Sequence, residues 1–110
     1  MGEMSIGGVF GCGAHAQYFT LPERKARETM VTIPANLGYE QAAACLEGTF
    51  YAASGINQLQ PKAGQKAMVY GATGAIGAAY VQLFKYYGLY VTAVCGGENF
   101  ELVRSWGADK

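Results

Sequence analysis

The stretch Met68-Val-Tyr-Gly71-Ala-Thr-Gly74-Ala-Ile-Gly77 decides the fold, because it has the pattern of a strand that runs through a glycine turn into a helix. Residues 67–70 are a short apolar run after the turn signal Gln60-Pro-Lys-Ala-Gly64. Residues 75–87 then repeat apolar side chains at helical spacing: Ile76, Ala79, Tyr80, Leu83, Phe84 and Tyr87. Strand, turn and helix follow one another in the order that a phosphate-binding glycine turn requires.

The three glycines of the turn have different physical roles. Gly71 permits a sharp exit from the strand, Gly74 lets backbone amides approach phosphate oxygens, and Gly77 lets helix and sheet pack closely. Unpaired N–H groups and the helix dipole attract an anion there. The sequence thus predicts a pyrophosphate site made of Gly71, Ala72, Thr73, Gly74, Ala75, Ile76 and Gly77. The alternative is a glycine turn that binds nothing. A P-loop is excluded because Gly-Lys-Ser/Thr does not occur.

A second strand is predicted over Tyr90–Val94, after Gly88, which is placed to end the helix with a positive φ. The result is a βαβ unit whose right-handed crossover would set the two strands side by side and parallel. A last helix is predicted over residues 98–106, with Phe100, Leu102, Val103 and Trp106 on its buried side. The chain ends where the third strand of a βαβαβ half is expected.

The segments before the glycine turn give further expectations. Residues 1–15 are glycine-rich and irregular, and residues 16–21 are predicted as a strand that Pro22 ends. A charged surface connection is expected over residues 23–29, and a short extended piece over residues 31–33.

Two helices are predicted between residue 38 and the turn signal. Gly38 is the expected N-cap of the first, and Gln41 is placed to accept a hydrogen bond from the backbone of the cap. Gly48 is expected to break this helix from a second one over residues 49–59. Their apolar residues are predicted to pack in the core: Ala43, Leu46, Phe50, Ala53 and Ile56.

The composition excludes several classes of protein. The 110 residues are 51% hydrophobic and 15% charged, which favours a globular chain over a disordered one. Eight basic and eight acidic residues cancel, so the basic surface of a nucleic-acid binder is not expected. No apolar run is long enough to span a membrane, and the N-terminus lacks the layout of a signal peptide.

The cysteines indicate a reducing compartment, the cytoplasm. Cys12, Cys45 and Cys95 are far apart and odd in number, so neither a disulfide framework nor a Cys-x-x-Cys metal site is expected. Cys12 and His15 alone are too few to hold a metal ion, and no metal is predicted.

Six segments in order resemble the medium-chain dehydrogenase/reductase superfamily, and most nearly its zinc-independent quinone oxidoreductase, or zeta-crystallin-like, branch. The resemblance covers almost the whole chain after residue 10. The segments are Gly13-Ala-His-Ala-Gln-Tyr18, Ile33-Pro-Ala-Asn-Leu37, Gln41-Ala-Ala-Ala44, Gln60-Pro-Lys-Ala-Gly-Gln65, Gly71-Ala-Thr-Gly-Ala-Ile-Gly77 and Glu101-Leu-Val-Arg-Ser-Trp-Gly-Ala-Asp109.

The resemblance implies an α/β fold with a partial Rossmann domain. Members have a GroES-like substrate domain followed by a six-stranded Rossmann domain, with the nicotinamide cofactor in the cleft between them. Residues 1–33 would then be the tail of the first domain and residues 34–110 the first half of the second. The family's chemistry is hydride transfer from NAD(P)H to a quinone or an enone. The chain is expected to be a fragment that is inactive as an enzyme by itself.

The resemblance also implies further cofactor-binding residues, with departures from the family pattern. Tyr51 stands where many members have a threonine that contacts the nicotinamide amide. Cys95 stands where NAD binders carry an acid, and Gly96-Gly97-Glu98 replaces the Ser-Thr-Lys of many NADP binders. The absent acid favours NADP, with NAD as the alternative. Gly96 and Asn99 complete the predicted site. No catalytic residue is assigned, since His15 and Glu47 are expected to be packing or surface residues.

Two other interpretations stay open. The chain could be a non-catalytic module that binds a nucleotide or associates with itself through an open strand edge, and a homodimer or higher oligomer is expected on that ground. A short-chain dehydrogenase has a similar glycine loop, but its loop lies near the N-terminus, and a Tyr-x-x-x-Lys pair is absent here.

Overall fold

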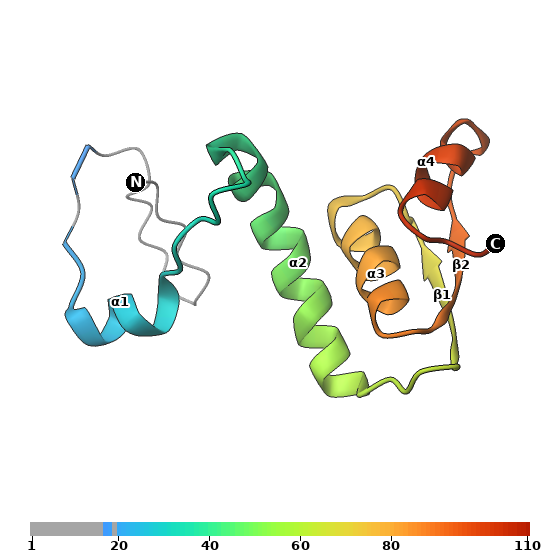
Figure 1. Ribbon diagram of the computed structural model, residues 1–110, viewed down its shortest axis with the longest axis horizontal. Coiled ribbons are helices and arrows are strands. Elements are labelled where there is room, and N and C mark those ends of the chain that lie inside the picture. The colour runs from blue at the N-terminus through green and yellow to red at the C-terminus, as the bar shows by residue number, and fades with distance from the viewer. Residues whose placement is uncertain (1–16, 19) are drawn as a thin grey trace. The chain divides into compact units, whose positions relative to one another are not determined.

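The computed structural model describes residues 17–18 and 20–110, which fall into two compact units divided between Leu37 and Gly38. The first unit contains one helix, and the second contains two strands with helices around them (Figure 1). The elements are α1 (Glu23–Thr29), α2 (Tyr39–Leu59), β1 (Lys66–Tyr70), α3 (Ala75–Tyr86), β2 (Tyr90–Val94), the 3-10 helix η1 (Gly97–Asn99) and α4 (Phe100–Ser105).

The charged surface connection predicted over residues 23–29 forms a helix, α1. The helix places opposite charges four residues apart, and Arg27 donates to the Glu23 carboxylate at 2.6 Å. Arg24 and Glu28 form a second such pair at 3.8 Å. These pairs stabilise a helix whose residues are not buried, so a charged composition does not distinguish a loop from an exposed helix.

The two early strand predictions are not supported where the structure describes them. Of residues 16–21, the described ones are Gln17, Tyr18, Thr20 and Leu21, and none belongs to a strand. Residues 31–33 likewise have no strand partner within the described part of the chain. Residues 31–33 are exposed, so water can satisfy their backbone polar groups without a strand partner.

The βαβ unit predicted from the glycine turn is confirmed. β1 and β2 are parallel, with Lys66 opposite Tyr90 and Tyr70 opposite Val94. Helix α3 connects them and packs on both. It ends as expected, because Gly88 has a φ of +78° just after the helix. The α/β fold with parallel strands and flanking helices is therefore the one that the sequence predicts.

The core lies between α2, α3, the two strands, α4 and the residues that follow α4. Val81 of α3 and Val91 of β2 are the largest fully buried side chains. Of the apolar residues found at helical spacing over residues 75–87, Phe84 is buried, Ile76 and Tyr87 are exposed, and the others are half-buried; Val81 lies outside that spacing. The buried cluster is Ile56, Val69, Ala72, Val81, Phe84, Leu89, Val91, Val103 and Ala108.

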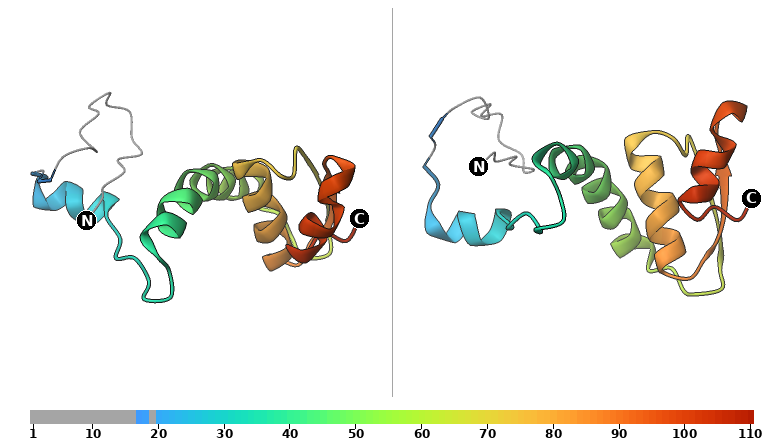
Figure 2. Two further views of the ribbon diagram at one scale, coloured as in Figure 1. Left: turned by 90° about the horizontal axis from the view of Figure 1, so that it is seen from above. Right: turned by 45° about the horizontal axis from the view of Figure 1, so that its top comes forward.

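Helix α2 is one continuous helix and lies alongside α3 (Figure 2). The cap is as predicted, since the Gly38 amide donates to the Gln41 side-chain oxygen at 3.0 Å. The predicted break at Gly48 is wrong. Gly48 is buried, and a Cβ there would lie 2.5 Å from the Ala75 carbonyl oxygen, so this glycine serves close helix packing.

The predicted core face of α2 is also mostly wrong. Its buried residues are Gly48, Ala52 and Ile56, spaced four apart. Of the five apolar residues predicted for the core, only Ile56 is buried and Ala53 is half-buried; the exposed ones are Ala43, Leu46 and Phe50. The helix packs through its small residues, which allow a closer approach of the two backbones.

The end of the chain forms η1 and α4 in place of one helix over residues 98–106. Val103 is buried and Trp106 half-buried, but Phe100 and Leu102 are exposed, contrary to prediction. After α4 the backbone turns along β2: the Asp109 amide donates to the Val91 carbonyl at 2.8 Å, and the Ala93 amide donates to the Lys110 carbonyl at 2.8 Å. The free side of β2 therefore receives these two residues in the manner of a strand.

Candidate dinucleotide-binding site

The glycine turn is fastened to the end of β2. The amides of Gly71 and Ala72 both donate to the Val94 carbonyl, at 3.0 and 3.1 Å, and the Gly74 amide donates to the Gly71 carbonyl at 3.0 Å. Gly71 has a φ of +71°, a conformation that L side chains rarely adopt. The turn after β1 and the end of β2 are thus held side by side, at the carboxyl ends of the parallel strands, where open α/β sheets bind ligands.

The N-terminus of α3 presents unpaired amides next to this turn. Gly74 is the N-cap, and no side chain of the described residues caps the helix. Within the described residues, the amides of Ala75, Ile76 and Gly77 donate to no protein acceptor. These amides and the positive end of the helix dipole favour an anion at this point.

The surroundings of the glycines show which of them the fold itself needs. A Cβ on Gly77 would clash with the Gly71 carbonyl oxygen and would lie 3.0 Å from Cα of Ala72. A Cβ on Gly74 would meet only the Gly71 oxygen, at 3.5 Å. Gly77 is therefore required by packing, whereas the space in front of Gly74 is free for a ligand.

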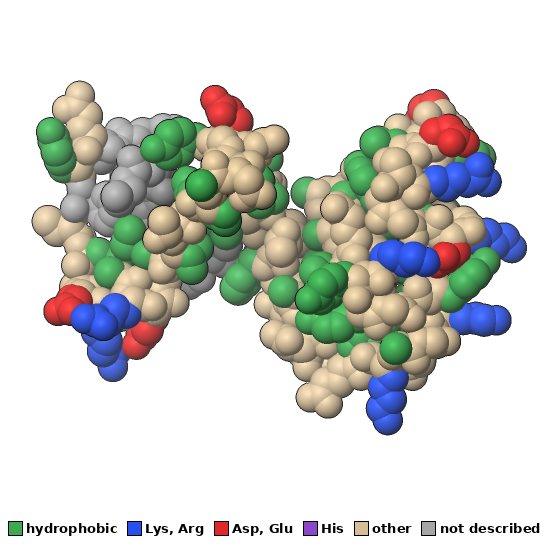
Figure 3. Space-filling model, viewed as in Figure 1, with side chains coloured by type: hydrophobic (Ala, Val, Ile, Leu, Met, Phe, Trp, Pro, Cys, Tyr) green, Lys and Arg blue, Asp and Glu red, His purple; other side chains and the backbone are tan. Residues whose placement is uncertain are grey.

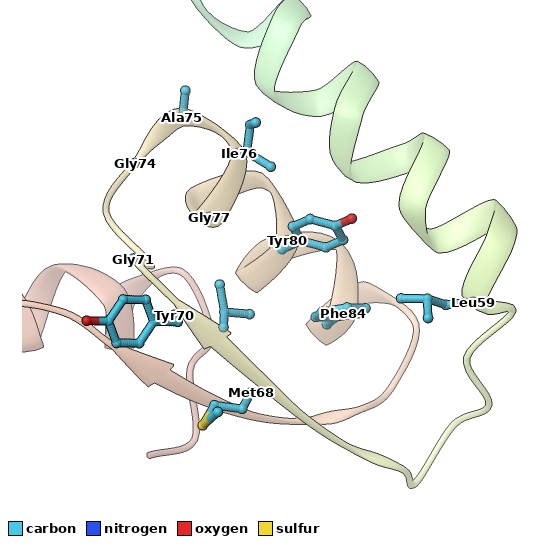
Figure 4. A pocket seen from close by; sticks show the side chains of 11 residues that line it. Leu59, Met68, Tyr70, Gly71, Gly74, Ala75, Ile76, Gly77, Tyr80 and Phe84 are labelled. Atoms are coloured by element: carbon cyan, nitrogen blue, oxygen red, sulfur yellow. The ribbon is translucent and has the colours of Figure 1, made fainter.

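An open pocket of about 650 Å³ extends from the turn along β1 (Figure 4). Tyr80 and Phe84 of α3 line it as a stacked pair with ring centroids 5.1 Å apart. Its wall is mostly apolar and comes from α2, β1, the turn and α3; the lining residues are Leu59, Met68, Val69, Tyr70, Gly71, Gly74, Ala75, Ile76, Gly77, Tyr80 and Phe84. The pocket brings together Gly71 with residues 74–77 of the predicted site.

Ala72 and Thr73 have other positions in the turn. Ala72 is fully buried in the core, and its amide is already bonded to Val94. Thr73 is exposed and does not line the pocket. Ala72 thus anchors the turn, and the pocket at the helix N-terminus is formed by the residues on either side of these two.

The end of β2 carries three further predicted residues. Cys95 is half-buried and packs against the core. The Asn99 amide donates to the Gly96 carbonyl at 2.9 Å, and the Asn99 side chain donates to the Glu98 carboxylate at 3.2 Å. In the sequence, Glu98 is notable only because it stands where many NADP binders have a lysine. Its nearness to Cys95 in sequence was the available signal, but the direction of its side chain depends on the fold of η1.

Tyr51 is not among the residues that line the pocket. It is an exposed residue of α2 in edge contact with Phe50, 5.7 Å between ring centroids. Glu47 is exposed on the same helix, and Cys12 and His15 lie outside the described residues. Residues 17–18 and 20–110 contain no group of three or more His, Cys, Asp or Glu side chains that could hold a metal ion. Nor do they contain a helix both long and apolar enough to cross a membrane.

Comparisons with known proteins find oxidoreductases. No family model matches the chain. The mitochondrial NAD(P)H oxidoreductase RTN4IP1 of Mus musculus is 37% identical over 82 residues, which are 70% of this chain and 21% of that protein. The chloroplastic quinone-oxidoreductase QR1 of Triphysaria versicolor is 31% identical over 105 residues, 94% of this chain and 32% of that protein. The chain thus spans about a fifth to a third of the length of these relatives.

A solved structure agrees with the fold. The quinone oxidoreductase of Thermus thermophilus, described with its NADPH complex, superposes with a TM-score of 0.70 and 31% identity over 76% of this chain and 28% of that one. Other relatives are trans-enoyl reductases and an alcohol dehydrogenase. With its glycine turn, parallel strands and these relatives, the chain belongs to the medium-chain dehydrogenase/reductase superfamily.

Proposed function

We propose that this chain forms the cofactor-binding part of an NAD(P)H-dependent oxidoreductase that reduces a quinone or an enone by hydride transfer. The observation that carries the proposal is the turn at residues 71–77, where three amides that have no acceptor among the described residues adjoin an open pocket. The names of the relatives, which are quinone oxidoreductases and trans-enoyl reductases, support the reaction class.

The residues of the turn fit a dinucleotide pyrophosphate. The amides of Ala75, Ile76 and Gly77 would donate to its phosphate oxygens, and Gly74 leaves room for their approach. The bound nicotinamide would supply the hydride, while this chain binds and orients the cofactor. No side chain in the described residues is assigned to proton transfer.

Several more specific statements about the protein are also proposals. Quinone rather than enone reduction, the absence of zinc and a cytoplasmic location are predictions from the sequence, as is the division into a GroES-like tail and a Rossmann half. The preference for NADP is likewise a prediction from the sequence, where Cys95 stands in the place of the acid that NAD binders carry. The chain alone is expected to turn over no quinone, because cofactor and acceptor must be held together in reacting geometry.

The turn can be tested with Gly74→Val, using Gly38→Val as a matched control. Both glycines are helix N-caps with almost the same backbone, φ −72° and ψ 162° at Gly74 against φ −76° and ψ 165° at Gly38. Valine therefore costs a similar amount of capping at either site, but only at residue 74 would it occupy the place of the pyrophosphate. Calorimetric titration with NADPH and with NADH measures binding.

We expect the unaltered chain and Gly38→Val to bind a dinucleotide and Gly74→Val to lose that binding by at least about tenfold, the loss of about one phosphate contact. Circular dichroism checks that both variants fold. Equal affinity in Gly74→Val and Gly38→Val would show that the turn is not the site, and binding of neither dinucleotide by the unaltered chain would leave the glycine turn a purely structural element.

A further inference from the structure

An acidic side chain lies at the carboxyl end of β2, although the residue that directly follows the strand in the sequence is a cysteine. In doubly wound folds this end lies beside the adenosine ribose, and an acid there accepts hydrogen bonds from the ribose hydroxyls. Cys95 occupies that position, but its side chain is half-buried against the core and carries no carboxylate. A residue that senses the ribose must therefore come from elsewhere.

Glu98 reaches back to this position from η1. A Cβ on Gly96 would lie 2.5 Å from Oε1 and 2.8 Å from Oε2 of Glu98. The carboxylate thus lies directly against Cα of Gly96, two residues beyond the end of β2, in the space that a Cβ would occupy. The Asn99 side chain donates to Oε1 at 3.2 Å and holds the carboxylate in place.

No basic side chain in the described part of the chain forms an ion pair with this carboxylate. Among the described residues, the ion pairs involve Glu23, Glu28, Glu101 and Asp109, and none involves Glu98. Glu98 and Glu101 are both exposed, and acidic side chains gather beside α4 at the upper right of Figure 3. This end of the strand therefore presents negative charge to a ligand.

We propose that Glu98 selects NADH over NADPH. This rests on the proposed function, namely dinucleotide binding at the glycine turn. The carboxylate accepts hydrogen bonds from the ribose hydroxyls of NADH, and it repels the additional phosphate that NADPH carries on the 2′-oxygen. The chain would then differ from the Thermus thermophilus relative, whose structure is described in complex with NADPH.

The test measures dissociation constants for NADH and NADPH on the full 110-residue chain, followed through the backbone amide NMR signals of residues 71–77. Glu98→Gln removes the charge and keeps the size, and Glu98→Lys reverses the charge. Glu101→Gln is the matched control, because Glu101 is an exposed acid of the neighbouring helix that pairs with Arg104. Thermal unfolding of each variant measures any merely structural role of Glu98 at the start of the helix.

We expect the unaltered chain and Glu101→Gln to bind NADH at least about tenfold more tightly than NADPH, the effect of one charged hydrogen-bonding group. Glu98→Gln should bring the ratio close to one, and Glu98→Lys should favour NADPH. A ratio of one in the unaltered chain, or one that Glu98→Gln leaves unchanged while both ligands still bind, overturns the role of Glu98 and leaves the glycine turn as the site. Binding of neither ligand overturns both proposals.

Discussion

Asp109 is the residue that ties the end of the chain to the βαβ unit. Its carboxylate accepts from Lys85 Nζ of α3 at 2.6 Å and from the Val91 amide of β2 at 2.8 Å. The hydrogen bond from Lys85, followed by that from Val91, lowers the pKa of Asp109 below its ordinary value of 3.8, against the opposing effect of desolvation. A single side chain thus joins a helix, a strand and the segment after α4.

The lowered pKa makes a pH-dependent contribution to stability. A carboxyl group whose pKa is lower in the folded state than in the unfolded state stabilises the fold when the pH is above the unfolded-state pKa. This contribution to stability is lost as the pH falls through the folded-state pKa. We therefore expect Asp109→Asn to lower the urea midpoint of unfolding at neutral pH, and the difference from the unaltered chain to shrink in acid well below pH 3.8. A difference of the same size at both pH values would contradict this account.

At the scale of elements, α2 and α3 pack through glycines. A Cβ at Gly48 would meet the Ala75 carbonyl, which is backbone and cannot move without shifting the start of α3. A Cβ at Gly55, further along the same helix, would instead meet the Tyr80 hydroxyl, at the end of a flexible side chain. The two glycines therefore offer a matched pair of substitutions in one helix.

Alanine raises helix propensity by about 1 kcal/mol relative to glycine at either site. We expect Gly48→Ala to destabilise the chain all the same, by about 1–3 kcal/mol, because overpacking against backbone exceeds that gain. Gly55→Ala should be less destabilising, since the clash is with the end of the Tyr80 side chain and not with backbone. Chemical unfolding of the two variants compares them directly. Equal stability would mean that α2 and α3 do not approach as closely as the structure has them.

These elements also show what the sequence could predict. The turn at residues 71–77 and the two strands were predictable because their signals are local: a glycine spacing, short apolar runs and Gly88 after the helix. The packing face of α2 was not predictable, because it depends on which small residues of α2 allow α3 to approach closely. The place of Glu98 also escaped prediction, because its side chain returns to Gly96 only once η1 has formed.

At the scale of the whole second unit, one strand edge has no neighbour among the residues that the structure describes. β2 receives Asp109 and Lys110 on its outer side, whereas within the described residues β1 pairs only with β2. Along β1, Met68 is 70% exposed and Tyr70 85% exposed, and both line the apolar pocket beside the turn. A two-stranded parallel sheet with such an edge is marginal alone, since parallel sheets are stable when their faces and edges are covered.

We therefore expect the isolated chain to associate with itself, most simply as a two-fold symmetric dimer that covers the β1 edge. Size exclusion coupled to light scattering at micromolar concentration measures the mass. Met68→Lys places a charge on this edge and should yield a monomer, because strand pairing would bury the ammonium group. Tyr86→Lys alters a similarly exposed apolar residue on α3, away from the edge, and should leave the dimer intact. A folded monomer for the unaltered chain would show that the β1 edge is stable without a partner.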